Sequence, residues 1–266
     1  MSTLLTPPAR TRFLAADLAF TRYNARRSLR LTPAALEVRR LGGAAAVRDT
    51  TSDAPYYNRI IGLTHADIGE LDAAIAWYRE VDRDCAISLT PDPASLAAMA
   101  PLARRGFTLF DSHAFFATRP TAAPAPSTGE VSVRRAGEVD LNAVFDLWQA
   151  GAPAIEREVR ALKAREQLDP RFHIYLASLD DRPVAMATTF CSDGVAWLGN
   201  ANTLPGWRRR GCQLALLRRR LADASAAGCA WALTDTAFGS ASHRNAERAG
   251  MPLAFLTYEL RRSRDR

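Results

Sequence analysis

The sequence has almost no lysine: Lys163 is the only one, although lysine and arginine together number 35. This excludes a phosphate loop of the Gly-Lys-Ser/Thr type, because Lys163 lies in a polar segment without glycine. The spaced glycines of a dinucleotide-binding fingerprint are also absent. Cysteine and histidine occur only four times each and without CxxC spacing, so we predict neither a disulfide framework nor a metal site.

Long apolar runs are missing as well, since none approaches the roughly 20 residues that span a bilayer. We therefore expect no membrane association, and the unpaired cysteines indicate a reducing, cytoplasmic location. The net charge of +7 comes almost wholly from arginine. Charge alone is weak evidence for nucleic acid, and no stacking motif accompanies it, so it fits a small anionic ligand equally well. We expect a monomer or a homodimer.

One segment marks a boundary between two domains. Residues 119–130 are rich in Pro, Ala, Ser and Thr and have no apolar period, which is typical of a linker. The sequence therefore predicts a first domain of residues 1–118 and a second of residues 131–266.

The second domain alternates strand and helix patterns, which indicates an α/β sheet. Its predicted strands are 131–135, 172–179, 183–192, 195–204, 229–235 and 253–260. Its predicted helices are 138–150, 154–167, 211–227 and 240–249.

The two halves repeat one another at an offset of 144 residues. Cys85-Ala86 pairs with Cys229-Ala230, since 229 − 85 = 144, and Gly106-Phe107 pairs with Gly250-Met251. At the same offset Asn58 pairs with Asn202, Gly62 pairs with Gly206, and the helical pattern 71–80 overlies 214–223. Several matches in register predict two copies of one fold.

The most informative segment is the turn between the predicted strand 195–204 and the helix that follows. A strand that turns into a helix leaves backbone N–H groups unpaired, and the helix dipole makes that end an anion site. Arg208, Arg209 and Arg210 add positive charge, and Gly211 lets a phosphate approach the backbone. The turn is predicted to hold a pyrophosphate.

These residues resemble the Arg-x-x-Gly-x-Gly/Ala loop of the GNAT N-acetyltransferases, although Gln213 stands where that pattern has Gly or Ala. The resemblance covers residues 131–260, and the segment from Ser242 to Met251 resembles the last helix of the family. It implies an α/β fold of two tandem GNAT-like domains, each with a mixed, mostly antiparallel central sheet flanked by helices.

The resemblance also implies acetyl-CoA (coenzyme A) as co-substrate, no metal, and direct attack of an amine on the thioester in a ternary complex. The coenzyme's pyrophosphate is expected on the loop, and its pantetheine arm along strand 195–204. The residues assigned to it are Asn202, Thr203, Leu204, Arg208, Arg209, Arg210, Gly211, Cys212, Gln213 and Asn245. For Cys212 a small packing role is the alternative, and for Asn245 the alternative is helix capping or solvent exposure. Arg218 to Arg220 are expected on the outer face of the helix, with contact of one of them to the adenosine 3′-phosphate as the alternative.

Three residues are candidates for the proton transfers. An amine with a pKa of about 10.4 must lose a proton before it attacks. Asp235, at the end of strand 229–235, is the candidate base, with helix capping or solvent exposure as the alternative. Many relatives protonate the leaving thiolate with a tyrosine at the position of Ala246, so His243 and Tyr258 become the candidates here, with water or the product amine as rivals.

The repeat distinguishes the two copies. At the offset Arg208 becomes Thr64, Arg210 becomes Ala66 and Gly211 becomes Asp67. A carboxylate at the phosphate-facing position repels a pyrophosphate, so we predict that the N-terminal copy is degenerate and binds no cofactor.

The acceptor amine is left open between a small molecule and a peptide or protein amine. The acidic residues of segment 154–167 suit a cationic acceptor, but they equally suit a solvated helix. A non-catalytic acyl-CoA-binding or sensor protein is the alternative to the enzyme, because the tyrosine is missing and one copy is degenerate. Nucleic-acid binding ranks third.

Overall fold

The computed structural model describes residues 7–90, 92–121, 130–149 and 156–262. Its contacts divide the chain into two compact units. Unit 1 comprises Met1–Phe115 together with Ala254–Arg266, and unit 2 comprises Phe116–Leu253. Most of the predicted linker, residues 122–129, lies outside the described residues. We describe each unit by itself.

Unit 2 alternates strands and helices much as the sequence predicts. Its strands are β6 (Ser132–Arg135), β7 (Phe172–Leu179), β8 (Arg182–Ser192), β9 (Val195–Thr203) and β10 (Trp231–Ala237). Its helices are α5 (Leu141–Trp148), α6 (Arg157–Ala164), α7 (Cys212–Ala226) and α8 (Ala241–Arg248). The strand order is β10-β9-β8-β7-β6. All neighbours are antiparallel except β9 and β10, which run parallel.

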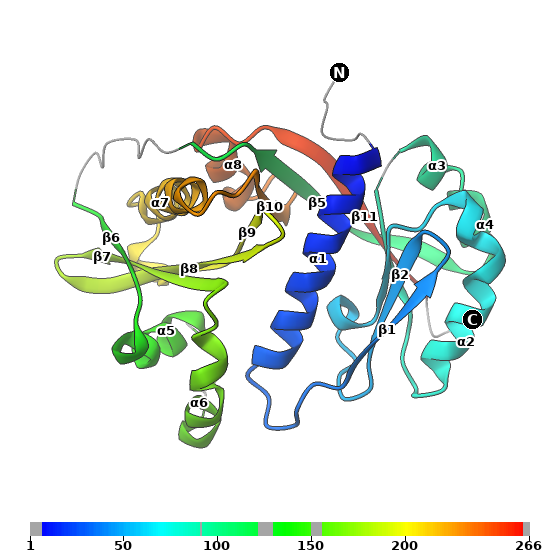
Figure 1. Cartoon of the computed structure of the whole chain (residues 1–266), viewed down its shortest axis with the longest axis horizontal. Coiled ribbons are helices and arrows are strands. Elements are labelled where there is room, and N and C mark those ends of the chain that lie inside the picture. Colours follow the sequence, from blue (N-terminus) through cyan, green and yellow to red (C-terminus); the bar gives the residue numbers. More distant parts are fainter. Residues whose placement is uncertain (1–6, 91, 122–129, 150–155, 263–266) are drawn as a thin grey trace. The chain divides into compact units, whose positions relative to one another are not determined.

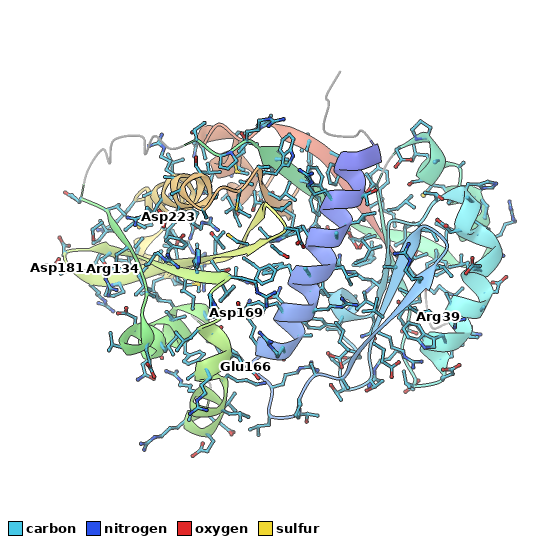
Figure 2. The ribbon with its side chains drawn as sticks, viewed as in Figure 1. Arg39, Arg134, Glu166, Asp169, Asp181 and Asp223 are labelled. Carbon is cyan, nitrogen blue, oxygen red and sulfur yellow. The ribbon has the colours of Figure 1, made fainter. Side chains whose placement is uncertain are left out.

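Helices cover both faces of this sheet, with α7 on one side and α5 on the other (Figure 1). Strand β7 is buried along nearly its whole length, as expected for a strand covered on both faces. Asp223 of α7, labelled in Figure 2, accepts hydrogen bonds from Tyr175 Oη of β7 at 3.0 Å and from Arg219 Nε at 2.8 Å. This contact fixes α7 along its axis, and so fixes the turn at its N-terminus.

Unit 1 contains the N-terminal elements and the last strand of the chain. Its helices are α1 (Pro7–Arg27), α2 (Leu71–Arg79), α3 (Pro93–Leu96) and α4 (Met99–Arg104). Its strands are β1 (Leu36–Leu41), β2 (Ala44–Asp49), β3 (Arg59–Ile61), β4 (Ala86–Leu89), β5 (Phe107–Thr118) and β11 (Leu253–Arg262). Of the last two, β5 belongs to unit 1 as far as Phe115, and β11 belongs to it from Ala254 onward. The order is β1-β2-β3-β4-β11-β5, with β3 and β4 parallel.

The last strand is where the observed division differs from the predicted one. The sequence assigns residues 253–260 to the second domain, but β11 from Ala254 onward belongs to unit 1. The reason is backbone pairing: Tyr258 lies opposite Leu89 and Leu260 opposite Ile87 in an antiparallel ladder with β4. Leu260 is 1% exposed in the same hydrophobic core as Ile87 and Leu89.

The 144-residue repeat has structural counterparts. Adding 144 to β5 gives 251–262, which matches β11, and adding it to α2 gives 215–223, which lies within α7. Gly106 and Gly250 have the same left-handed φ, +82° and +81°, before equivalent strands. The offset fails at β3, which would fall at 203–205, because β9 is longer and ends at Thr203.

In unit 1 a carboxylate occupies the turn that corresponds to the arginine loop. Asp67 lies in a short 3-10 helix, His65–Glu70, and is 4% exposed. Its carboxylate accepts hydrogen bonds from Thr64 N at 2.8 Å, Thr64 Oγ1 at 2.8 Å and Gly43 N at 2.9 Å. Thr64, which precedes this short helix, and Gly43, between β1 and β2, therefore donate their backbone N–H groups to an anion that belongs to the chain itself.

Replacing Asp67 should destabilise the protein. Asp67→Ala leaves two backbone N–H groups without their acceptor, and we expect the free energy of unfolding to fall by about 1–3 kcal/mol in a urea titration. Glu70→Ala removes an exposed carboxylate from the same 3-10 helix and should change it by less than about 0.5 kcal/mol. Equal losses in the two variants would contradict a structural role for the buried carboxylate.

Candidate functional site

The site begins where β9 and β10 separate. The two strands pair in parallel only from Val195 opposite Trp231 to Trp197 opposite Leu233. At the next step the Thr234 hydroxyl donates a hydrogen bond to the Leu198 carbonyl at 2.7 Å, and the ladder ends there. Beyond this point, the edges of β9 and β10 that face each other have no strand between them. A ligand with amide groups can therefore bind there as a strand would.

A β-bulge shapes the β9 side of this opening. Met186 of β8 lies opposite Asn202 and Thr188 opposite Gly199, so β9 has one extra residue between these pairs. Asn200 takes up the extra length with a φ of +48°. Thr188 Oγ1 donates to the Gly199 carbonyl at 3.1 Å and accepts from Asn200 Nδ2 at 3.3 Å. The bulge is thus held in one conformation by its neighbour on β8.

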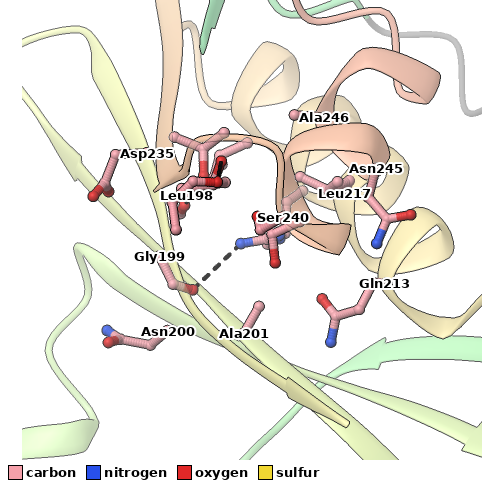
Figure 3. Close-up of a pocket in the computed structure, with 15 residues that line it drawn as sticks. Leu198, Gly199, Asn200, Ala201, Gln213, Leu217, Asp235, Ser240, Asn245 and Ala246 are labelled. Carbon is pink, nitrogen blue, oxygen red and sulfur yellow. Dashed lines mark hydrogen bonds between the residues drawn. The ribbon is translucent and has the colours of Figure 1, made fainter. Parts of the chain in front are cut away.

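Between the separated strands and the helices α7 and α8 lies a pocket of about 420 Å³. Figure 3 shows residues of β9 on one side and of α7 and α8 on the other. The lining residues are Leu198, Gly199, Asn200, Ala201, Gln213, Leu217, Arg220, Thr234, Asp235, Thr236, Ala237, Ser240, Ser242, Asn245 and Ala246. Three residues predicted from the sequence, Asp235, Gln213 and Asn245, are among them.

The N-terminus of α7 provides an anion-binding geometry beside this pocket. The first helical hydrogen bond runs from Ala215 N to Gly211 O at 3.0 Å, so the preceding N–H groups lie outside the helical ladder. Gly211 has a φ of +83° and Arg209 one of +65°, which turns the backbone sharply into the helix. No atom lies within 4 Å of the place where a Cβ of Gly211 would be. The loop therefore leaves open space beside unpaired donors.

The three arginines of this loop are exposed, and two of them have identified contacts. The Arg208 Nε donates to the Thr203 carbonyl at 3.4 Å, and the Arg210 guanidinium lies 4.9 Å from the centre of the Trp207 ring. Burial raises the pKa of the Cys212 thiol, which is 2% exposed and packs in a hydrophobic cluster with Leu216. The structure thus supports the packing role of Cys212.

The strand residues predicted to contact the cofactor have other contacts. The Asn202 Nδ2 donates to the Leu147 carbonyl of α5 at 2.7 Å, and Leu204 packs against the cluster around Cys212. Thr203 Oγ1 accepts a hydrogen bond of 2.8 Å from Gln213 Nε2. The bulge residues Leu198 to Ala201, rather than Asn202 to Leu204, line the pocket. Gly199 inside a strand pattern was the signal that could have indicated a bulge.

Asp235 lines the pocket from β10 and does not cap the following helix. The cap of α8 is Ser240, whose Oγ accepts from His243 N at 3.1 Å. The capping alternative for Asp235 therefore does not hold.

The two candidates for protonating the thiolate, His243 and Tyr258, are not among the residues that line the pocket. His243 is 9% exposed and packs edge-on against the rings of Phe116 and Phe238, with Nε2 3.5 Å from Glu247 Oε1. Its backbone lies in the first turn of α8, and its side chain is enclosed by apolar rings. Tyr258 belongs to unit 1, where it packs against the hydrophobic core beside β4.

Arg220 was not recognised as a site residue from the sequence. It was expected on the outer face of its helix with Arg218 and Arg219, but it is 2% exposed and lines the pocket. The signal was available in the periodicity of α7, because Leu216, Arg220 and Ala224 are spaced by four on its buried face. Because Arg220 follows two other arginines in the sequence, this periodicity was not assigned to it.

Two structural features are absent from the part of the chain that the structure describes. It has no group of three or more His, Cys, Asp or Glu side chains arranged to hold a metal ion. Its helices include none with the length and apolar character that crossing a membrane requires.

Comparison with known proteins finds a family model that matches part of the chain. Residues 122–232 match the acetyltransferase (GNAT) domain family. This part of the chain is similar to the GNAT acetyltransferases. No curated protein sequence matches the chain.

Solved structures of GNAT proteins share the fold over nearly the whole chain. A GCN5-related N-acetyltransferase from Kribbella flavida is 18% identical, with a TM-score of 0.66 and 95% of each chain covered. A second, from Sphaerobacter thermophilus, is 18% identical, with a TM-score of 0.61 and 82% of this chain and 80% of that one covered. A tandem GNAT protein from the clavulanic acid biosynthesis pathway is 15% identical, with a TM-score of 0.59, covering 94% of this chain and 95% of that one. The predicted α/β fold of tandem GNAT-like domains is thereby confirmed.

Proposed function

We propose that unit 2 binds acetyl-CoA and transfers its acyl group to an amine in a ternary complex. The observation that carries this proposal is the pocket between the separated strands β9 and β10, next to the N-terminus of α7. The donors fit the coenzyme: the unpaired N–H groups and the exposed arginines suit a pyrophosphate, and the open edge of β9 suits the amides of a pantetheine arm.

The residues of the pocket supply what direct transfer needs. Bound coenzyme supplies the thioester that the amine attacks. A C–N bond forms as the C–S bond breaks, and the coenzyme leaves as a thiolate that takes its proton from water or from the product amine. We assign Asp235, which lines the pocket from β10, to accept the proton of the attacking amine. Backbone donors of the bulge around Asn200 are proposed to stabilise negative charge on the carbonyl oxygen.

We further propose that unit 1 binds no coenzyme. Asp67 supports this proposal, because its carboxylate lies in the corresponding turn and already accepts hydrogen bonds from the backbone N–H groups of Thr64 and Gly43. A pyrophosphate there would lie beside a buried negative charge and would find those donors occupied. Unit 1 would then have a structural role, and the acceptor would be a small-molecule or peptide amine that binds to unit 2.

The alternative function is a non-catalytic acyl-CoA sensor. It is favoured by Ala246, which lines the pocket at the position where many relatives have a tyrosine. A sensor needs only the pocket and the loop, and these are equally consistent with both functions. Turnover distinguishes the two.

Calorimetric titration with acetyl-CoA and with free coenzyme A tests the proposal. We expect one site per chain, followed by thioester consumption when a panel of amines is added. Two sites would contradict the assignment of unit 1. Binding without turnover of any amine would favour the sensor, and absence of binding would overturn both functions.

A further inference from the structure

The pocket of unit 2 has a buried cation in its wall. Arg220 is 2% exposed, and its donors bind backbone carbonyls: Nε to Leu216 O at 3.3 Å, and Nη1 to Thr188 O at 3.0 Å and Gly199 O at 3.4 Å. Figure 3 draws the last of these as the dashed line that ends on Gly199. Arg220 therefore contacts the bulge directly, and the same residue lines the pocket.

This cation has no counter-ion in the described part of the chain. No ion pair joins Arg220 to a carboxylate there, whereas its neighbour Arg219 pairs with Asp223 at 2.8 Å. Nη2, with two N–H groups, donates no hydrogen bond to a described residue. Desolvation by burial lowers the pKa of Arg220 to about 10, so the guanidinium still carries its charge at neutral pH. A buried charge without a partner is costly, and a ligand anion would remove that cost.

The position of Arg220 shows which part of a ligand could supply the anion. Arg220 is nine residues after Gly211, which is about 14 Å along the axis of α7 at 1.5 Å per residue. Phosphate groups held by the loop at Gly211 are too far away to pair with it. The thioester end of the coenzyme is the part expected beside the bulge, which Arg220 contacts through Gly199. An anion that pairs with Arg220 would therefore belong to the acyl group or to a group close to it.

We propose that the acyl group carries a terminal carboxylate and that Arg220 binds it, so that the preferred donor is a dicarboxylic acyl-CoA of the succinyl type. This inference rests on the proposed function, since it assumes that coenzyme A binds to unit 2. A guanidinium with two free N–H groups on one nitrogen suits a carboxylate, because charge-assisted hydrogen bonds are the strong ones. The acetyl group would occupy the same pocket without this contact.

Two ligands of equal acyl length test the proposal on the unmodified protein. Succinyl-CoA and butyryl-CoA both have four acyl carbons, and only the first has a carboxylate. We expect calorimetry to give a dissociation constant for succinyl-CoA at least about tenfold lower than for butyryl-CoA. Equal affinities, or tighter binding of butyryl-CoA, would overturn the proposal.

A pair of variants assigns that preference to Arg220. Arg220→Gln should bring the ratio of the two dissociation constants close to one, whereas Arg218→Gln, which removes a charge from the same helix outside the pocket, should leave it unchanged. If the role of Arg220 were purely structural, its replacement would weaken the binding of both ligands and leave the ratio of the two dissociation constants unchanged. That result would overturn the proposal. If Arg220→Gln does not fold, Arg220→Lys, which keeps the charge but loses Nη2, should reduce the ratio; an unchanged ratio would overturn the proposal.

The same titrations separate this proposal from the function on which it depends. If acetyl-CoA and butyryl-CoA bind and succinyl-CoA binds no more tightly than butyryl-CoA, the acyl-CoA site is supported and the carboxylate contact is rejected. If none of the three thioesters binds to the full chain, both are rejected.

Discussion

Arg208→Ala combined with Arg210→Ala should weaken the binding of coenzyme A by about tenfold to a hundredfold. Both guanidinium groups flank the unpaired N–H groups at the start of α7 and are exposed, so salt screens part of their contribution. The loss should therefore be larger at low ionic strength. Titration calorimetry at two salt concentrations measures both effects.

The repeat provides the matched control for this double variant. Thr64 of unit 1 corresponds to Arg208, and Thr64→Ala should leave the affinity and the one-site stoichiometry unchanged. If the control weakened binding as strongly as the double variant, the assignment of the coenzyme to unit 2 alone would be rejected. If neither change affected binding, the arginine loop would have no role in it.

Asp235→Asn should lower the rate of acyl transfer by about a hundredfold to ten-thousandfold, the usual contribution of a general base. The affinity for coenzyme A should hardly change, because Asp235 lines the pocket from β10 and not from the loop. The remaining rate should rise with pH, since an amine with a pKa of about 10.4 loses its own proton at high pH and then needs no base.

Steady-state rates across the pH range measure this effect, with Asp181→Asn as the control. Asp181 is an exposed carboxylate of unit 2 that does not line the pocket, and its replacement should leave the profile unchanged. If the Asp235→Asn profile coincided with that of the unmodified protein, Asp235 would be removed from the mechanism.

Much of the fold was accessible from local patterns. The predicted strand 172–179 coincides with β7, and the predicted helix 211–227 differs from α7 by one residue at each end. These elements are determined by periodicity and by turn residues such as Gly211, which act over a few positions. The repeat was visible as well, because Gly106 and Gly250 must adopt the same left-handed conformation.

The candidate site was only partly accessible in the same way. The loop from Arg208 to Gln213 and the carboxylate Asp235 could be found because their chemistry follows a strand end or opens a helix. The bulge at Asn200 depends on pairing with Thr188, and a single sequence does not specify that register. His243 looked available in a polar helix, but packing against Phe116 and Phe238 encloses its ring.

By itself, the sequence determined which segments form helices and strands, and it predicted two related copies and a loop that could bind an anion. These properties arise from neighbours along the chain. Only the tertiary structure decided that β11 joins unit 1, that β9 and β10 separate to form the pocket, and that Arg220 lies in its wall with no described carboxylate paired to it. Each of these depends on contacts between distant residues, since pairing register and burial are set when the elements pack together.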